Sequence, residues 1–239
     1  MKYQLRDYQK KASDAAVMCF KMKSGRNGLL VLPTGAGKSL IIADIAARLE
    51  EPLIVFQPNK EILEQNFAKL QTYGIWDCSI YSASVGRKEI SRITFATIGS
   101  VIRHMKDFQH FKNILIDECH LVKPSDGMYK RFFEQAERRI VGLTATPYRL
   151  YSCMNGSMLK FLTRTRPRVF SQVLYYCQVS ELLAKGFLSR LKYYDVTRID
   201  LTKVRRNSSG ADFDDASLSD EFRRVDLYGY LISIVKRLL

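Results

Sequence analysis

Short apolar runs alternate with longer amphipathic segments through the first 150 residues of the chain. Apolar runs of four or five residues are typical of buried strands in a parallel sheet, whereas apolar positions three and four residues apart predict helices. The predicted strands are residues 28–32, 53–56, 79–81, 93–96, 114–117 and 140–143. The predicted helices are one that ends near Gly25, one at 38–49, and one at 60–70 with Asn59 as its N-cap. This alternation predicts an α/β fold with a doubly wound, mainly parallel sheet and helices on both faces.

The pattern is less regular after residue 150. Residues 151–216 are interpreted as a basic insert followed by a segment that returns to the sheet. A short helix is predicted near residues 180–185, and the β-like run at 191–196 is the candidate for the returning strand. Lys160, Arg164, Arg166 and Arg168 lie among aromatic residues, a mixture that suits single-stranded nucleic acid, although those aromatics could equally belong to the core.

A glycine-rich loop between the strand at 28–32 and the helix at 38–49 carries the strongest chemical signal. It reads Pro33-Thr34-Gly35-Ala36-Gly37-Lys38-Ser39. Gly35 and Gly37 leave room for backbone N–H groups to surround a phosphate. Lys38 would reach the β- and γ-phosphates, and the Ser39 hydroxyl would ligate Mg²⁺. Leu32 stands where the general pattern has its first glycine, so the motif departs from that pattern at one position.

A second signal follows the predicted strand at 114–117, where Asp117 and Glu118 adjoin. The carboxyl ends of parallel strands meet at one edge of a sheet, so this acidic pair can face the glycine-rich loop. Asp117 could then hold Mg²⁺, and Glu118 could orient and deprotonate an attacking water molecule. Lys38, Asp117 and Glu118 are therefore the candidate catalytic residues.

These segments resemble, in order, the motifs of superfamily 2 helicases and translocases. Asp117-Glu118-Cys119-His120 resembles the DExH form of the Walker B motif, and residues 143–149 resemble motif III. The adenine motif, motif I, motif Ia and motif Ib are matched by residues 5–9, 33–39, 56–59 and 94–100. The resemblance implies a RecA-like P-loop NTPase lobe over residues 1–150 that uses ATP and Mg²⁺. The RadD-like DNA-repair helicases are the most similar group, while type I and type III restriction translocases share much of the pattern.

The resemblance also assigns roles outside motifs I and II. The amide of Gln9 can match the Hoogsteen edge of adenine, and Arg6 would cover the base. His120, Thr144 and Thr146 would couple the site to the loop that carries Glu118. Loop amides and hydroxyls would contact nucleic-acid phosphates without reading bases. The candidates for that contact are Pro58, Asn59, Thr97, Gly99 and Ser100.

Composition adds bounds on partners and location. The net charge of +14 favours a polyanionic partner, and we expect DNA rather than RNA because the signatures of DEAD-box RNA helicases are not found. The sequence has no signal-peptide pattern and no apolar run long enough to span a membrane. Its five cysteines form no C-x-x-C pair. We expect a monomeric, cytoplasmic protein that does not act at a membrane.

The last segment, residues 217–239, predicts one helix that begins at a capping box formed by Ser217 and Asp220. Its apolar stripe consists of Phe222, Val225, Tyr228, Leu231, Val235 and Leu238. We expect this helix to lead toward a second RecA-like lobe missing from this chain. In the resembled family that lobe donates arginines to the γ-phosphate, and no Q-x-x-G-R-x-x-R pattern occurs here.

The sequence therefore predicts the ATP-binding first motor lobe of a nucleic-acid-dependent ATPase, weakly active in hydrolysis and inactive as a helicase in this form. Two other interpretations stay open. The chain could be a nucleotide-switched nucleic-acid-binding module without motor activity, or a subunit of a restriction-type translocase.

Overall fold

The computed structural model describes residues 4–22, 27–153, 156–191, 199–207 and 212–238. The chain divides into two compact units, Met1–Ser189 and Arg190–Leu239. The division of roles predicted at residues 150 and 216 stays a prediction.

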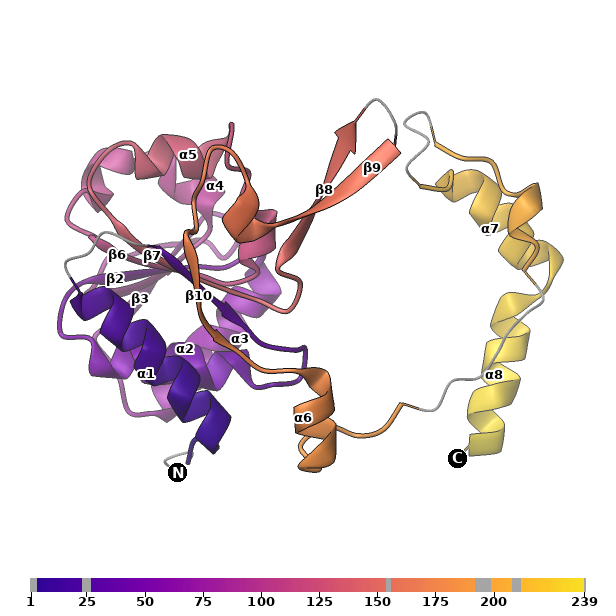
Figure 1. The fold of residues 1–239 in the computed structure, drawn as a ribbon, viewed down its shortest axis with the longest axis horizontal. Coiled ribbons are helices and arrows are strands. Elements are labelled where there is room, and N and C mark those ends of the chain that lie inside the picture. Colours follow the sequence, from indigo (N-terminus) through magenta and orange to yellow (C-terminus); the bar gives the residue numbers. More distant parts are fainter. Residues whose placement is uncertain (1–3, 23–26, 154–155, 192–198, 208–211, 239) are drawn as a thin grey trace. The chain divides into compact units, whose positions relative to one another are not determined.

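The first unit is built on one sheet, which has eight strands in the described residues (Figure 1). Their order is β10-β1-β7-β6-β2-β5-β3-β4, and every pairing is parallel except that between β3 and β4. The strands are β1 Gly28–Val31, β2 Leu53–Phe56, β3 Cys78–Ser82, β4 Arg87–Lys88, β5 Ile93–Ala96, β6 Asn113–Ile116, β7 Arg139–Thr144 and β10 Gln172–Tyr176. The predicted doubly wound, mainly parallel sheet is confirmed.

Helices cover both faces of this sheet (Figure 1). One face carries α1 Asp7–Lys21, α2 Lys38–Arg48 and α3 Lys60–Thr72, and the other carries α4 Ile98–Val101 and α5 Met128–Phe133. Successive strand residues alternate between the two cores, as Leu29 and Leu30 do in β1. Asn59 caps α3 as predicted, since its Oδ1 accepts a 2.9 Å bond from the backbone N–H of Ile62. Short 3₁₀ turns lie at Met105–Phe108, Cys119–Leu121 and Leu162–Arg164.

The strand that returns to the sheet is β10, which pairs in parallel with β1. The run at 191–196, predicted for this place, lies almost wholly outside the described residues. Before β10, the strands β8 Tyr148–Cys153 and β9 Gly156–Phe161 form a separate antiparallel pair, which is not among the predicted strands. After β10, α6 Val179–Ala184 matches the predicted short helix.

The second unit contains a 3₁₀ turn at Leu201–Lys203 and the helices α7 Asp215–Arg224 and α8 Leu227–Leu238. The predicted single helix is wrong, because Asp226 takes a left-handed conformation (φ 46°) between the two helices. Its carboxylate accepts a 3.3 Å bond from the N–H of Gly229 and so begins a new helix. The predicted cap is also wrong: Asp214 caps α7 by accepting a 2.9 Å bond from the N–H of Ser217. In the part of the chain that the structure describes, no helix is long and apolar enough to cross a membrane.

Gly142 in β7 allows the loop after β6 to approach the sheet. A Cβ atom there would lie 2.6 Å from Sγ of Cys119 and 2.8 Å from Cε1 of Phe170. We expect Gly142→Ala to lower the free energy of unfolding by about 1–3 kcal/mol, because overpacking a dense core forces its neighbours apart. Urea unfolding measures the change.

Gly99→Ala is the matched control. No heavy atom lies within 4 Å of the added Cβ, and the residue is helical, so its stability should be unchanged or raised by up to about 1 kcal/mol. Equal losses in the two variants would contradict the packing argument.

Candidate active site

The glycine-rich loop runs from β1 into α2, as the sequence predicts. Gly35 and Gly37 both have positive φ angles, 81° and 77°, which side chains disfavour. A Cβ on Gly37 would also stand 2.5 Å from Nε2 of Gln9. The backbone of the loop therefore lines the place where a phosphate would be held, with no side chain on Gly35 or Gly37. The helix α2 begins at Lys38 immediately after the loop.

The acidic pair lies at the end of β6, in a backbone that fixes both side chains. The N–H of Asp117 donates to the carbonyl of Phe56 at 3.0 Å and continues the β2–β6 ladder. The Oδ1 of Asp117 accepts a 3.0 Å bond from the N–H of Glu118. Glu118 has a φ of 46°, an uncommon value for a residue with a side chain and one that recurs at functional sites.

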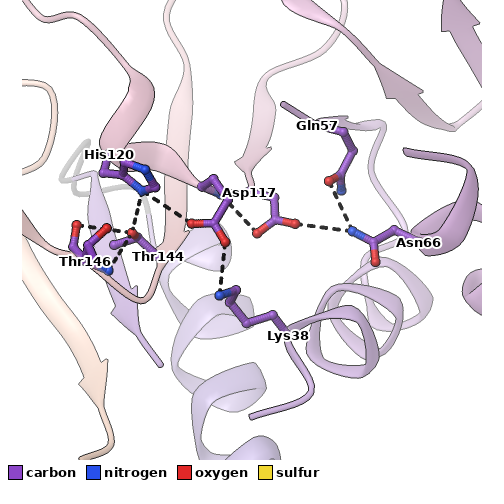
Figure 2. Close-up of polar contacts among 8 residues, drawn as sticks. Lys38, Gln57, Asn66, Asp117, His120, Thr144 and Thr146 are labelled. Atoms are coloured by element: carbon purple, nitrogen blue, oxygen red, sulfur yellow. Dashed lines mark hydrogen bonds and ion pairs between the residues drawn. The ribbon is translucent and has the colours of Figure 1, made fainter. Parts of the chain in front are cut away.

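Motifs I and II meet at the sheet edge. Nζ of Lys38 lies 3.1 Å from Oε1 of Glu118, and both side chains are largely shielded from solvent. In Figure 2 the dashed line from Lys38 marks this ion pair. The structure thus brings together the three candidate catalytic residues, although Lys38 and Asp117 are 79 positions apart in the sequence.

Asp117 is buried, with 6% of its surface exposed. Burial raises its pKa from 3.8 to about 6, and the neighbouring charge of Glu118 acts in the same direction. Lys38, the N–H of Glu118 and the amide of Asn66 lower the pKa. A cation placed beside this carboxylate would relieve the cost of keeping it ionised, which suits the predicted Mg²⁺ ligand.

The predicted coupling residues form a second arm of contacts around Glu118 (Figure 2). Nδ1 of His120 lies 3.3 Å from Oε2 of Glu118 and 3.0 Å from Oγ1 of Thr144. The backbone N–H of Thr146 donates to the same Thr144 oxygen at 3.0 Å. Thr144 therefore contacts the Glu118 loop through His120, while Thr146 contributes its backbone to these contacts.

The adenine motif packs against the glycine-rich loop. Nε2 of Gln9 donates to the carbonyl of Ala36 at 2.9 Å, and its Oε1 accepts from the N–H of Arg6 at 2.9 Å. The Tyr8 hydroxyl donates to the same Ala36 carbonyl. The Arg6 guanidinium lies 4.1 Å from the ring centre of Phe187. The expected contacts of Gln9 and Arg6 with adenine stay a prediction.

Phe187 was not identified from the sequence. Phe187 follows α6, and its ring centre lies 5.8 Å from that of Tyr8. The next residue, Leu188, lies over Gly35, since a Cβ atom added to Gly35 would stand 2.9 Å from Cδ2 of Leu188. The sequence pattern predicts only the end of a helix in this region. The aromatic residue directly after a helix-ending glycine was the available signal.

The candidates for nucleic-acid contact divide into two groups. Pro58, Thr97 and Gly99 line a cavity of about 470 Å³ at the same edge of the sheet. The side chain of Asn59 is used as the cap of α3. The Ser100 hydroxyl is buried and accepts a 2.8 Å bond from the N–H of Ala83. The cavity is completed by Gln57, Ile98, Leu121, Lys123, Asp126, Gly127, Met128, Tyr129 and Arg131.

The basic stretch after residue 150 is partly structural. Phe170, one of its aromatic residues, is 2% exposed and belongs to the core beneath α4 and α5. Tyr176, in contrast, is 62% exposed on β10. Core packing therefore explains Phe170, and contact with nucleic acid by this stretch stays a prediction.

Residues 2–149 match the family model described as "Type III restriction enzyme, res subunit". The chain belongs to this family. It is 29% identical over 151 residues to the DNA 3'-5' translocase XPB2 of Sulfurisphaera tokodaii, covering 62% of this chain and 32% of the relative. It is also 29% identical over 154 residues to the DNA 3'-5' helicase XPB of Mycobacterium tuberculosis, covering 60% and 27%. The chain thus spans about a third of the length of these relatives.

A solved structure of the Type ISP restriction-modification enzyme LlaGI shares the fold, with a TM-score of 0.57 and 15% identity. The match covers 77% of this chain and 18% of that chain. The predicted relationship to superfamily 2 helicases and translocases is confirmed, together with the RecA-like fold. The narrower likeness to RadD-like helicases stays a prediction.

The raised pKa of Asp117 makes a pH-dependent prediction. Because the folded protein binds this proton more tightly than the unfolded chain, it holds more protons between pH 3.8 and about 6. Asp117 therefore lowers the free energy of unfolding as the pH rises through that window. In metal-free buffer, Asp117→Asn should gain stability relative to the unsubstituted chain across this range, by at most about 3 kcal/mol.

Urea unfolding at a series of pH values measures this difference, and the fixed effect of the substitution on hydrogen bonds cancels in the slope. Asp126→Asn makes the same substitution on the exposed loop before α5 and is measured alongside as a comparison. Parallel curves for Asp117→Asn and the unsubstituted chain would contradict the prediction.

Proposed function

We propose that this chain is the ATP-binding first lobe of a nucleic-acid-dependent motor, a helicase or translocase that acts on DNA. The observation that carries the proposal is the meeting of Lys38 with Glu118 at 3.1 Å beside the buried carboxylate of Asp117. A glycine-rich loop with two left-handed glycines opens onto the same place. This set of groups suits phosphoryl transfer to water.

Each residue has a role that follows from its position. The backbone N–H groups between Gly35 and Lys38 would hold the phosphates, and the Lys38 ammonium would neutralise charge on them. Ser39 and Asp117 would hold Mg²⁺, which supplies further charge neutralisation on the β- and γ-phosphate oxygens when it is bound. Glu118 would orient the attacking water and accept its proton. Nδ1 of His120 lies 3.3 Å from the other oxygen of that carboxylate and 3.0 Å from Oγ1 of Thr144, so these two residues would fix the direction of Glu118.

DNA is the proposed partner because the named relatives are a DNA translocase and a DNA helicase, and because the net charge is +14. The cavity lined by Pro58, Thr97 and Gly99 is the proposed place of contact with its backbone. We further propose that the protein is monomeric and lies in the cytoplasm. A second lobe that supplies arginines would be needed for fast turnover, so we expect this chain to bind ATP and hydrolyse it slowly.

The first test is Mg²⁺-dependent ATP binding, measured by calorimetry. Lys38→Ala should weaken binding about 10- to 100-fold, because it removes a charged hydrogen-bond donor to the phosphates. Lys10→Ala is the matched control, since the Lys10 side chain is 67% exposed and forms a surface ion pair of 3.0 Å with Asp14. Equal ATP affinity in Lys38→Ala and the unsubstituted chain would overturn the nucleotide site.

Glu118→Gln separates the motor from a nucleotide switch. We expect the variant to keep ATP affinity within about threefold and to lose at least about 100-fold in ATP hydrolysis, since the amide cannot accept the proton from water. Phosphate release measures the rate, and ATP binding to the same samples controls for folding. Retained hydrolysis in Glu118→Gln would show that this carboxylate is not the base. If DNA strongly stimulates ATP hydrolysis by the unsubstituted chain, the need for a second lobe is contradicted.

A further inference from the structure

Three buried polar side chains form a hydrogen-bonded chain along the sheet edge. Nδ2 of Asn66 donates to Oε1 of Gln57 at 3.1 Å and to Oδ2 of Asp117 at 3.2 Å (Figure 2). Gln57 follows β2, Asn66 lies on α3, and Asp117 follows β6. Gln57 is 1% exposed and Asn66 is 2% exposed. We name these three residues the amide relay.

The amide relay is incomplete within the protein. Nε2 of Gln57 and Oδ1 of Asn66 are buried and have no hydrogen-bond partner in the described residues. Buried amides are normally paired, because an unpaired polar atom loses its bonds to water without compensation. The open donor at Gln57 therefore calls for an acceptor that the described residues do not supply.

Gln57 also lines the cavity that contains Pro58 and Thr97. Two basic residues, Lys123 and Arg131, line the same cavity, together with one acidic residue, Asp126. Phosphate and sugar oxygens of a nucleic-acid backbone are acceptors, and the lysine and arginine complement the charge of the phosphates. The amide relay thus joins a cavity suited to nucleic acid with the carboxylate expected to hold Mg²⁺.

We propose that Gln57 and Asn66 are positioning residues that couple occupancy of this cavity by a DNA backbone to the orientation of Asp117. The inference rests on the proposed function and adds a second route between the two sites. It is separate from the arm formed by His120 and Thr144, which holds Glu118 from the other side.

The physical step is local. An oxygen of the DNA backbone would accept the free N–H of Gln57 and fix the side chain whose Oε1 holds one N–H hydrogen of Asn66. The other hydrogen of the same Asn66 nitrogen holds Oδ2 of Asp117. Because hydrogen bonds in series polarise and orient one another in a buried site, fixing the first amide restricts the carboxylate at the far end.

The test is the mutual effect of two ligands on each other's binding. Calorimetry gives the Kd of the non-hydrolysable analogue AMP-PNP with Mg²⁺, alone and with a saturating oligo-dT strand. We expect the strand to change that Kd by at least about fivefold in the unsubstituted chain, and reciprocally. In Gln57→Leu the strand should change the Kd of AMP-PNP by less than about twofold. The Kd of AMP-PNP without DNA should stay within about threefold of that of the unsubstituted chain.

Asn66→Leu should also abolish the coupling and, because Asn66 contacts Asp117 directly, raise the Mg²⁺ concentration needed for nucleotide binding. Gln65→Leu places the same apolar side chain at an exposed position of α3. It should keep both the coupling and the Mg²⁺ requirement of the unsubstituted chain. Thermal unfolding of every variant identifies any that do not fold. Gln57→Leu decides the outcome if the Asn66 variant is unfolded.

Full coupling in a folded Gln57→Leu variant overturns the inference. If the unsubstituted chain binds both ligands with no mutual effect, the inference also fails while the proposed function stands. If it binds neither AMP-PNP nor DNA, the proposed function fails and the inference fails with it. An equal response to an oligo-U strand leaves the relay intact and removes the preference for DNA.

Discussion

Parallel pairing of β1 with β7, and of β7 with β6, is the constraint on which the site depends. Parallel strands end at the same edge, so the loop after β1 and the loop after β6 open side by side although their residues are far apart in the sequence. The register then places Lys38 and Glu118 within ion-pair distance. Gly142, in the strand between them, keeps the space that the loop after β6 needs.

The site keeps local features that a purely structural core would avoid. Glu118 has a left-handed backbone and Asp117 is a buried carboxylate with a raised pKa. Two amide atoms beside Asp117 have no hydrogen-bond partner among the described residues. Each of these features costs stability. The two apolar cores on either side of the sheet offset that cost, because most residues of its eight strands pack into one of them. Such a division between a stable frame and an unfavourable site is common where proteins bind charged ligands.

Local patterns were sufficient to predict the frame and the two main motifs. The six strands predicted from apolar runs are present, because a strand buried on both faces needs a continuous apolar sequence. The glycine-rich loop was predictable because few residues other than glycine tolerate its backbone angles. The strand β10 was missed, since its side chains are only partly buried at the sheet edge and its sequence has no clear alternation.

Other features depend on contacts that no single segment reveals. The break between α7 and α8 depends on Asp226, whose carboxylate offers the backbone an alternative bond. Asn66 interrupts the apolar face of α3 beside Leu63, Phe67 and Leu70, a signal that could have been noticed. Its partners, Gln57 and Asp117, come from two other elements, so only the folded chain shows what the amide contacts.

The edge strand β10 also defines where this lobe can be cut. The family match ends at residue 149, yet β1, which leads into the glycine-rich loop, pairs on one side with residues 172–176. A fragment trimmed to the matched region would expose the hydrogen-bonding edge of an apolar strand, the kind of surface on which chains associate. Sequence-defined domain limits would therefore produce an aggregation-prone fragment here, and the folding unit has to be taken as far as Ser189.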